Sequence, residues 1–162
     1  MRWLAFIVFL LSFTASSGPR STTGGDDDAE LRRMHELVLQ AHRAGEVAPW
    51  LAIEADSYVV ARRGELDFPT KSERREARSS YLGSTRFASY RDLREPIVMV
   101  SKDGSLGWLI AQVEATGVQA LPDGTEQPLH FISAWIELYR KGPGGWRMVG
   151  NVSNFRPEGR DP

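Results

Sequence analysis

The chain has no cysteine among its 162 residues. Disulfides, thiolate nucleophiles, iron–sulfur clusters and cysteine-ligated zinc are therefore excluded, and stability has to come from a packed core. An excess of charge of one sign is also missing, since 20 Lys and Arg residues stand against 21 Asp and Glu residues. Without net positive charge, the chain lacks the attraction that drives non-specific binding to nucleic acid. We therefore expect one globular domain and no nucleic-acid partner.

Motifs of cofactor enzymes are missing as well. The sequence has no glycine-rich phosphate loop, no Gly-x-Ser-x-Gly nucleophile elbow and no dinucleotide fingerprint. His35 and His42 stand seven positions apart on a predicted helix, about 10 Å along its axis, so they cannot share one zinc ion. His35-Glu36 also lacks the second histidine, four residues after the first, that a zincin helix needs. We expect no cofactor and no metal site.

The N-terminal segment indicates export, because ten of the eleven residues 3–13 are apolar. This run follows Arg2 and precedes the small residues Thr14–Gly18, which is the pattern of a signal peptide, cleaved here after Ser17. Its eleven residues are fewer than the roughly 20 that a membrane span takes, and an uncleaved N-terminal anchor is the alternative. We expect a periplasmic or secreted protein with no membrane attachment after cleavage.

The mature chain divides into three parts. Residues 18–28 are rich in Gly, Ser, Thr and Asp, which predicts a flexible leader. Residues 29–157 hold the apolar residues of one domain, and residues 158–162 are predicted to be a disordered tail.

Helices are predicted in the first half of the domain. Apolar residues recur at three- and four-residue spacing over residues 29–44, with Asp28 as the N-cap. A shorter helix is predicted over Val47–Ala55 and a charged third helix over Lys71–Leu82. The β-branched and aromatic segment Tyr58–Ala61 predicts a strand between them.

The sequence pattern of the second half of the domain predicts a β-sheet. Period-two segments alternate with turn residues such as Asp103-Gly104, which is a strong hairpin signal. In the long segments, apolar residues occupy both the odd and the even positions, and therefore both faces of each strand. We expect both faces of the sheet to be covered, one by helices and the other by a second copy of the chain. The alternative is that the outer face carries scattered apolar residues exposed to solvent. Helices followed by strands predict an α+β domain in which a cone-shaped, curved antiparallel β-sheet wraps around the N-terminal helices. The candidate strands are residues 87–93, 97–101, 106–118, 130–139 and 146–155.

The order of several short motifs resembles the nuclear transport factor 2-like superfamily, and especially its SnoaL-like branch and exported members. The resemblance covers essentially all of Ala29–Pro157. It implies a cone with an internal pocket and dimerisation through the outer face of the sheet. The superfamily holds isomerases, dehydratases, hydrolases and association domains, so it implies no single activity. The motifs are Trp50-Leu51, Ala55-Asp56-Ser57-Tyr58, Ser101-Lys102-Asp103-Gly104-Ser105-Leu106-Gly107-Trp108, Gly144-Gly145-Trp146-Arg147-Met148-Val149 and Ser153-Asn154-Phe155.

Catalytic candidates follow from the resemblance, since members that transfer protons use carboxylates with a Tyr or His inside the cone. Asp56, beside Tyr58, is the best local carboxylate, and His130 is the candidate histidine on a strand. A turn carboxylate and a surface histidine are the alternatives for the two. The isomerase members place their base at the end of the first strand, where this chain has Arg62-Arg63, which departs from an isomerase of that type.

The aromatic residues predict what a pocket would bind. Rings that line a partly hollow cone favour a flat apolar or aromatic ligand. The predicted pocket residues are Trp50, Phe68, Tyr81, Trp108, Trp135 and Asn151.

The sequence thus predicts an exported domain that binds a small, largely apolar or aromatic molecule or a partner, forms a homodimer through its sheet and catalyses no reaction. One alternative is a cofactor-independent lyase, isomerase or hydrolase that uses Asp56 and His130 for proton transfer, with Tyr58 orienting the substrate. Another is a structural dimerisation module whose cone is filled by its own side chains.

Overall fold

The computed structural model describes residues 23–62 and 64–155. The predicted signal peptide, residues 1–17, and the predicted tail, residues 158–162, lie outside the described residues. Helices and strands follow one another along the chain as α1 (Thr23–Ala44), α2 (Val47–Ala52), β1 (Glu54–Arg62), β2 (Glu65–Asp67), α3 (Lys71–Ser84), β3 (Thr85–Asp92), β4 (Ile97–Val100), β5 (Leu106–Ala120), β6 (Glu126–Gly142) and β7 (Gly145–Phe155).

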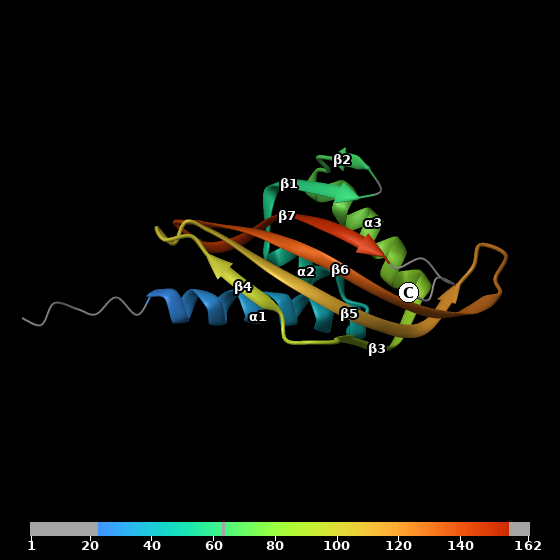
Figure 1. The fold of residues 1–162 in the computed structure, drawn as a ribbon. Coiled ribbons are helices and arrows are strands. Elements are labelled where there is room, and N and C mark those ends of the chain that lie inside the picture. The colour runs from blue at the N-terminus through green and yellow to red at the C-terminus, as the bar shows by residue number, and fades with distance from the viewer. Residues whose placement is uncertain (1–22, 63, 156–162) are drawn as a thin grey trace, which may run out of the picture.

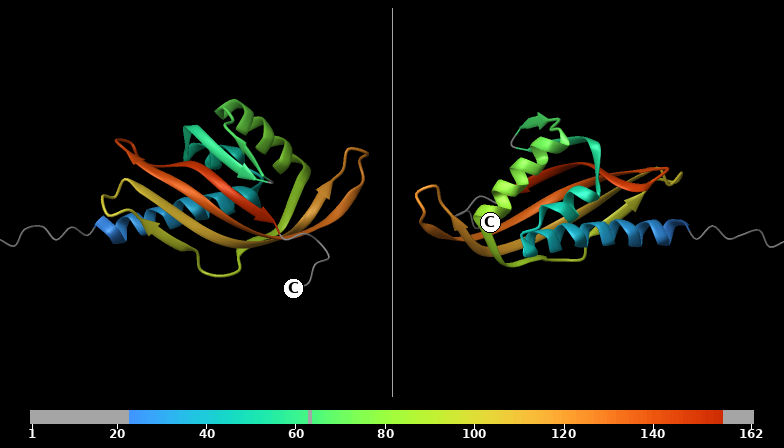
Figure 2. Two further views of the ribbon diagram at one scale, coloured as in Figure 1. Left: turned by 45° about the horizontal axis from the view of Figure 1, so that its top comes forward. Right: turned by 180° about the vertical axis from the view of Figure 1, so that it is seen from behind.

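The strands of the described chain form one sheet in the order β2-β1-β7-β6-β5-β3, and β4 pairs with β5 next to β3. The sheet is strongly bent, and the three helices lie on one side of it (Figures 1 and 2). The α+β fold with a curved sheet around N-terminal helices is therefore confirmed. The sheet is mostly antiparallel, and β1 runs parallel to β7.

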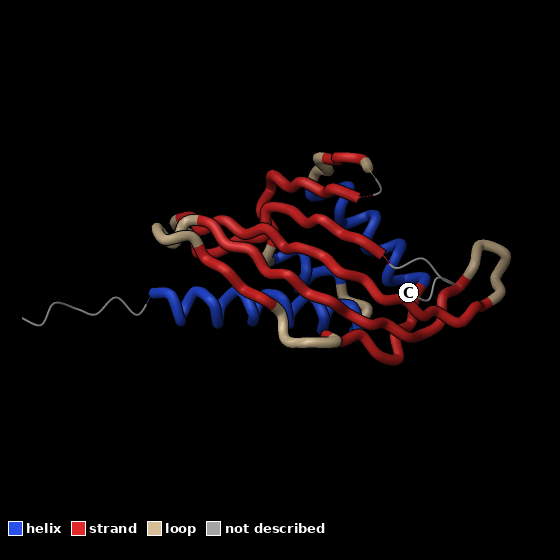
Figure 3. Tube along the Cα trace, viewed as in Figure 1, coloured by secondary structure: helices blue, strands red, loops and turns tan. Residues whose placement is uncertain are grey.

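Tight turns connect the long strands, as the turn residues predict (Figure 3). Gly104 and Gly124 have φ of 68° and 83°, a left-handed conformation that glycine adopts without steric cost. β5 and β6 pair continuously from Leu106 with Arg140 to Ala120 with Glu126. These two strands form the longest pairing of the sheet.

Helix α1 begins earlier than the sequence predicts. The described helix already includes Thr23, so the second half of the predicted flexible leader is helical. Asp27 explains why this segment is part of the domain: its buried carboxylate accepts hydrogen bonds from Trp146 Nε1 at 2.9 Å and from Lys141 Nζ at 2.6 Å. The composition of the segment shows only that it is polar. Its helical structure could not be predicted from composition, because the partners of Asp27 lie more than a hundred residues away in the chain.

The end of α2 and the start of β1 also differ from prediction, whereas α3 begins at Lys71 as predicted. Helix α2 ends at Ala52, and β1 begins at Glu54, because Glu54 already pairs with Met148 of β7. Helix α3 begins after Thr70, whose hydroxyl accepts a hydrogen bond from the Glu73 backbone N–H. The Glu73 carboxylate in turn accepts from the Thr70 N–H, which completes a capping box.

The core lies between α1 and the concave face of the sheet. On β5, Leu109 and Val113 point inward and are fully buried, and they belong to one buried cluster with Leu31 and Met34 of α1. The alternate residues of β5 face outward, and Ile110 is 37% exposed. Both faces of the sheet are thus apolar, but within the described chain the helices cover only the concave face.

Candidate functional site

A cavity of about 750 Å³ lies within the concave side of the sheet, between α1, α2 and α3. A volume of this size is typical of small-molecule sites. Its wall is mostly aromatic and aliphatic, with a few polar groups from the sheet and arginines from β1 and α3. The rings on the wall are those of His42, Trp50, Tyr58, Phe68, Tyr81, Tyr90, Phe131 and Trp135, and the polar groups from the last two strands are Glu137, Asn151 and Ser153.

His42 of α1 is at the centre of the aromatic wall. Its ring stacks on Tyr90 with 4.2 Å between centroids and lies 4.5 Å from Trp50. Nδ1 donates to the Val38 carbonyl oxygen at 2.7 Å, and burial lowers the pKa of His42 to about 4. The imidazole is therefore neutral near pH 7, and its Nε2, which has no hydrogen-bond partner among the described residues, is an acceptor.

Glu137 of β6 is the buried carboxylate of the cavity. Its Oε1 accepts hydrogen bonds from His35 Nδ1 at 2.8 Å and from Trp135 Nε1 at 3.0 Å. Its Oε2 accepts one from the Tyr139 hydroxyl at 2.6 Å. Trp135, Glu137 and Tyr139 alternate along β6, so all three point to the concave face.

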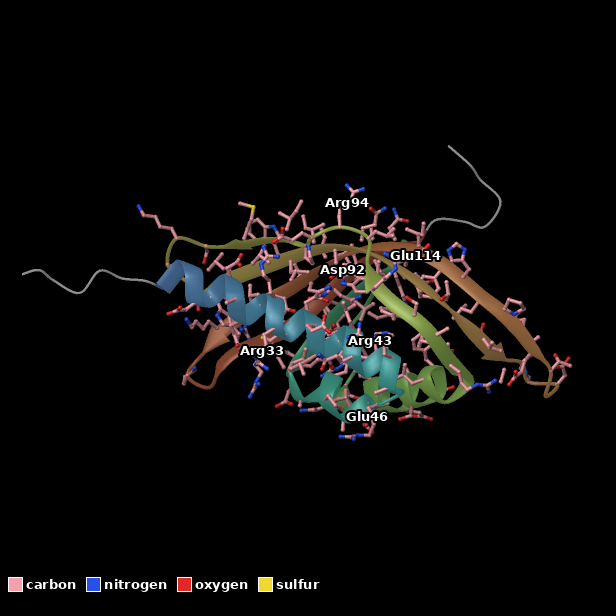
Figure 4. The ribbon with its side chains drawn as sticks, turned by 90° about the horizontal axis from the view of Figure 1, so that it is seen from below. Arg33, Arg43, Glu46, Asp92, Arg94 and Glu114 are labelled. Carbon is pink, nitrogen blue, oxygen red and sulfur yellow. The ribbon has the colours of Figure 1, made fainter. Side chains whose placement is uncertain are left out.

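His35 joins this carboxylate to a second one. Its Nε2 lies 3.1 Å from a carboxylate oxygen of Asp92, the last residue of β3. Asp92 is labelled in Figure 4 and lies close to α1. Burial by itself would lower the pKa of His35, but the hydrogen bonds to Asp92 and Glu137 outweigh burial and raise the pKa to about 10. An imidazole that donates from both nitrogens is an imidazolium, so His35 carries a positive charge between two carboxylates.

A second buried ionic group lies on the α3 side of the cavity. The Glu54 carboxylate, whose side chain has no exposed surface, forms ion pairs with Arg74 and Arg78. The Arg78 guanidinium also stacks 4.0 Å from the centre of the Trp50 ring, and that of Arg74 lies 4.7 Å from the Tyr58 ring. Two cations thus share one carboxylate here, the reverse of the arrangement around His35.

Most of the predicted pocket residues do line the cavity. They are Trp50, Phe68, Tyr81, Trp135 and Asn151. Tyr58, predicted to orient a substrate, also lines the cavity and is buried. Its hydroxyl lies 3.2 Å from Met148 Sδ and 3.4 Å from Asn151 Oδ1, and burial raises the pKa of Tyr58.

Three predicted residues lie elsewhere, which corrects the sequence interpretation. The Asp56 side chain is 96% exposed and faces Lys71 at 3.8 Å. His130 is exposed, and its Nε2 lies 3.3 Å from Glu114. Trp108 pairs with Leu138 on the outer face of the sheet. The structure therefore brings neither Asp56 nor His130 into the cavity, and it does not bring them together.

Sequence reasoning missed the buried ionic residues His35, Glu137 and Glu54. For Glu137 a signal was present: it stands midway between Trp135 and Tyr139 in a period-two segment, where a charged residue on an apolar face needs partners. For Glu54 there was none, because its partners come from a charged helix whose sequence predicts a mostly solvated face. Arg62, where the sequence departs from the isomerases, lies in the cavity wall, and Arg63 is outside the described residues.

Residues 23–62 and 64–155 contain neither a metal site nor a membrane-spanning helix. No group of three or more His, Asp or Glu side chains in these ranges has an arrangement that would hold a metal ion. None of the helices in these ranges combines the length and the apolar character needed to cross a membrane.

Comparison with solved structures identifies the architecture. A nuclear transport factor 2-like protein from Salmonella enterica superposes with a TM-score of 0.68 at 15% identity, covering 84% of this chain and 95% of that one. A ketosteroid isomerase-like protein from Erwinia carotovora gives 0.64 at 18% identity, with 82% and 98% covered. A nuclear transport factor 2-like protein from Cytophaga hutchinsonii gives 0.62 at 15% identity, with 79% and 97% covered. No protein-family profile and no curated protein sequence matches the chain.

Proposed function

Because the chain has the nuclear transport factor 2-like fold, we propose that it uses the hollow of its cone to bind a small, largely apolar or aromatic molecule, and that it does so without catalysis. The observation that carries this proposal is the cavity of about 750 Å³ with its aromatic wall. A structural module filled by its own side chains would leave no such space. The buried charged groups at the cavity have partners from the chain itself, so the open surface favours an apolar body.

The alternative of an enzyme based on Asp56 and His130 receives no support from the geometry. A proton-transferring pair has to lie within hydrogen-bond reach of the same substrate. The Asp56 side chain is 96% exposed beside α3, while His130 pairs with Glu114 outside the cavity. We therefore keep the binding function as the proposal.

The test uses N-phenyl-1-naphthylamine, a neutral apolar dye whose fluorescence rises in dry pockets. We expect saturable binding to the wild-type protein. Ser153→Trp places a large ring into the cavity wall and should weaken binding at least tenfold. Asn154→Trp changes the next residue, which is exposed and pairs with the outward-facing Ala134, and should leave binding unchanged. Equal effects of the two variants, or no binding to the wild type, would refute the proposal.

We further propose export and a homodimer. Export is supported by the apolar run at residues 3–13 and the small residues after it. Its test is the N-terminal residue of the protein recovered from the periplasm or the medium, which we expect near Gly18; recovery with Met1 from the cytoplasm would contradict it. The homodimer is supported by the apolar outer face of the sheet, which no helix of the described chain covers.

A further inference from the structure

The cavity has a polar end that specifies more than apolar character in a ligand. Glu137 lines the cavity and its side chain is only 2% exposed. Three donors already hold its orientation: the His35 imidazolium and the Trp135 indole on Oε1, and the Tyr139 hydroxyl on Oε2. A carboxylate has about four lone-pair positions, so one acceptor position on Oε2 is left.

The charges around Glu137 make this open position attractive to a donor. His35 is the one cation between the carboxylates of Asp92 and Glu137, at 3.1 Å and 2.8 Å, so the three groups carry a net negative charge. On the other side of the cavity, Arg74 directs its N–H groups to Glu54 and to backbone carbonyls such as Ala55 O at 2.6 Å. The cation nearest Glu137 is thus His35, and both of its nitrogens are already engaged.

The rings beside Glu137 fix where the body of a ligand would lie. Trp135, two residues before it on β6, lies 6.3 Å from Tyr90, and Tyr90 lies 6.1 Å from Phe131. All three rings line the same cavity as Glu137. A flat ring that packs against them brings a substituent on its edge within reach of the carboxylate.

We propose that Glu137 is the recognition group for a hydrogen-bond donor, a hydroxyl or an amine, carried on the aromatic or alicyclic body of the ligand. This inference rests on the proposed binding function and narrows it to a class of ligand. Hydrogen bonds to a buried carboxylate are stronger than those between neutral groups, so a missing donor is expected to cost affinity clearly.

The test compares two probes of the same ring system by isothermal titration calorimetry. 2-Naphthol carries a hydroxyl donor, and 2-methoxynaphthalene carries the same oxygen without the proton. We expect the wild-type protein to bind 2-naphthol at least tenfold more tightly. In Glu137→Gln, which keeps the shape of the side chain but removes its charge, the preference should fall below threefold. The control is Glu114→Gln, which removes the charge of a carboxylate outside the cavity that pairs with Arg91 and His130. This variant should keep the wild-type preference.

The outcomes separate the two proposals. If neither probe binds, the binding function itself fails. If both bind the wild type equally well, the cavity binds apolar molecules but Glu137 does not select a donor, and the inference is overturned. A preference that persists in Glu137→Gln also overturns it, because another acceptor such as His42 Nε2 would then be the recognition group. The wild-type comparison holds even if the variant folds poorly.

Discussion

His35 Nδ1 donates to Glu137 Oε1 at 2.8 Å, although the two residues are 102 positions apart in the chain. The bond joins α1, which forms the roof of the cone, to β6 in the middle of the sheet. Because α1 also places His42 in the cavity wall, and Glu137 lines the same cavity, this contact holds the helix against the sheet beside the cavity. The buried charges therefore support the site as well as the fold.

The stability of the protein should depend on pH through His35. Its pKa is about 10 in the folded protein and near 6.5 when unfolded. Because the pKa is raised, the contribution of His35 is complete below about pH 6.5 and is lost as the pH rises toward 10. At 1.36 kcal/mol per pKa unit, this amounts to at most about 5 kcal/mol. Urea unfolding between pH 6.5 and 10 measures the loss.

The matched control for this pH dependence is His35→Gln, which keeps a donor but cannot titrate. Its free energy of unfolding should be lower than that of the wild type at pH 6.5, and the difference should shrink as the pH rises. A difference that stays constant from pH 6.5 to 10 would mean that His35 is not an imidazolium in the folded protein.

Glu54 should be far more important for stability than Asp56, two residues along the same strand. Glu54→Ala leaves Arg74 and Arg78 without their carboxylate in a buried site, which costs about 3–5 kcal/mol. Asp56→Ala removes an exposed carboxylate and should change the free energy of unfolding by less than about 0.5 kcal/mol. Denaturant titration of both variants checks the contrast, and similar losses would contradict the assignment of the buried ionic group.

The contrast between Glu54 and Asp56 also shows how far sequence reasoning reaches. Side chains alternate between the two faces of a regular strand, so Glu54 and Asp56 would be expected on the same face. However, the pairing of β1 with β7 shifts register between Glu54 and Val59. A bulge of this kind decides which carboxylate is buried, and it depends on a strand ninety residues later in the chain. The sequence therefore pointed to the exposed carboxylate and passed over the buried one.

The aromatic residues give a second example. Trp108 and Trp135 both lie in strands whose odd and even positions are apolar. The residues next to each Trp in the sequence therefore do not indicate which side chains face inward. Cross-strand pairing decides it: Trp135 pairs with the buried Ala111, while Trp108 pairs with Leu138 on the outer face. By contrast, the turns at Gly104 and Gly124 are encoded locally, and β5, the strand between them, is predicted correctly in type and to within two residues in extent.

Gly150 should resist even a one-carbon enlargement. A Cβ at this position would lie 2.5 Å from the Val59 carbonyl oxygen and from Val59 Cγ1, where β1 runs beside β7. Gly150→Ala should therefore destabilise the protein by about 1–3 kcal/mol. Gly83 in α3 has nothing within 4 Å of the added carbon, so Gly83→Ala should stabilise by up to about 1 kcal/mol. Melting temperatures of both variants test this, and a shift in the same direction for both would contradict it.

The outer face of the sheet should hold a second copy of the chain. A cross-strand row of apolar residues runs from Ile97 of β4 through Ile110 and Ile136 to Val152 of β7, and no helix of the described chain covers it (Figure 2). Ile97 is 56% exposed and Val152 41% exposed, an apolar area that water favours burying.

Ile110→Lys places a charge in the middle of that row and should weaken self-association at least tenfold, because an unpaired charge is costly in an apolar interface. Ala44→Lys introduces the same charge at an exposed position on α1, on the opposite side of the sheet, and should leave association unchanged. Sedimentation velocity of the wild type should give twice the mass of one chain. A monomeric wild type, or an Ile110→Lys variant that stays dimeric, would show that this face does not pair with its own copy.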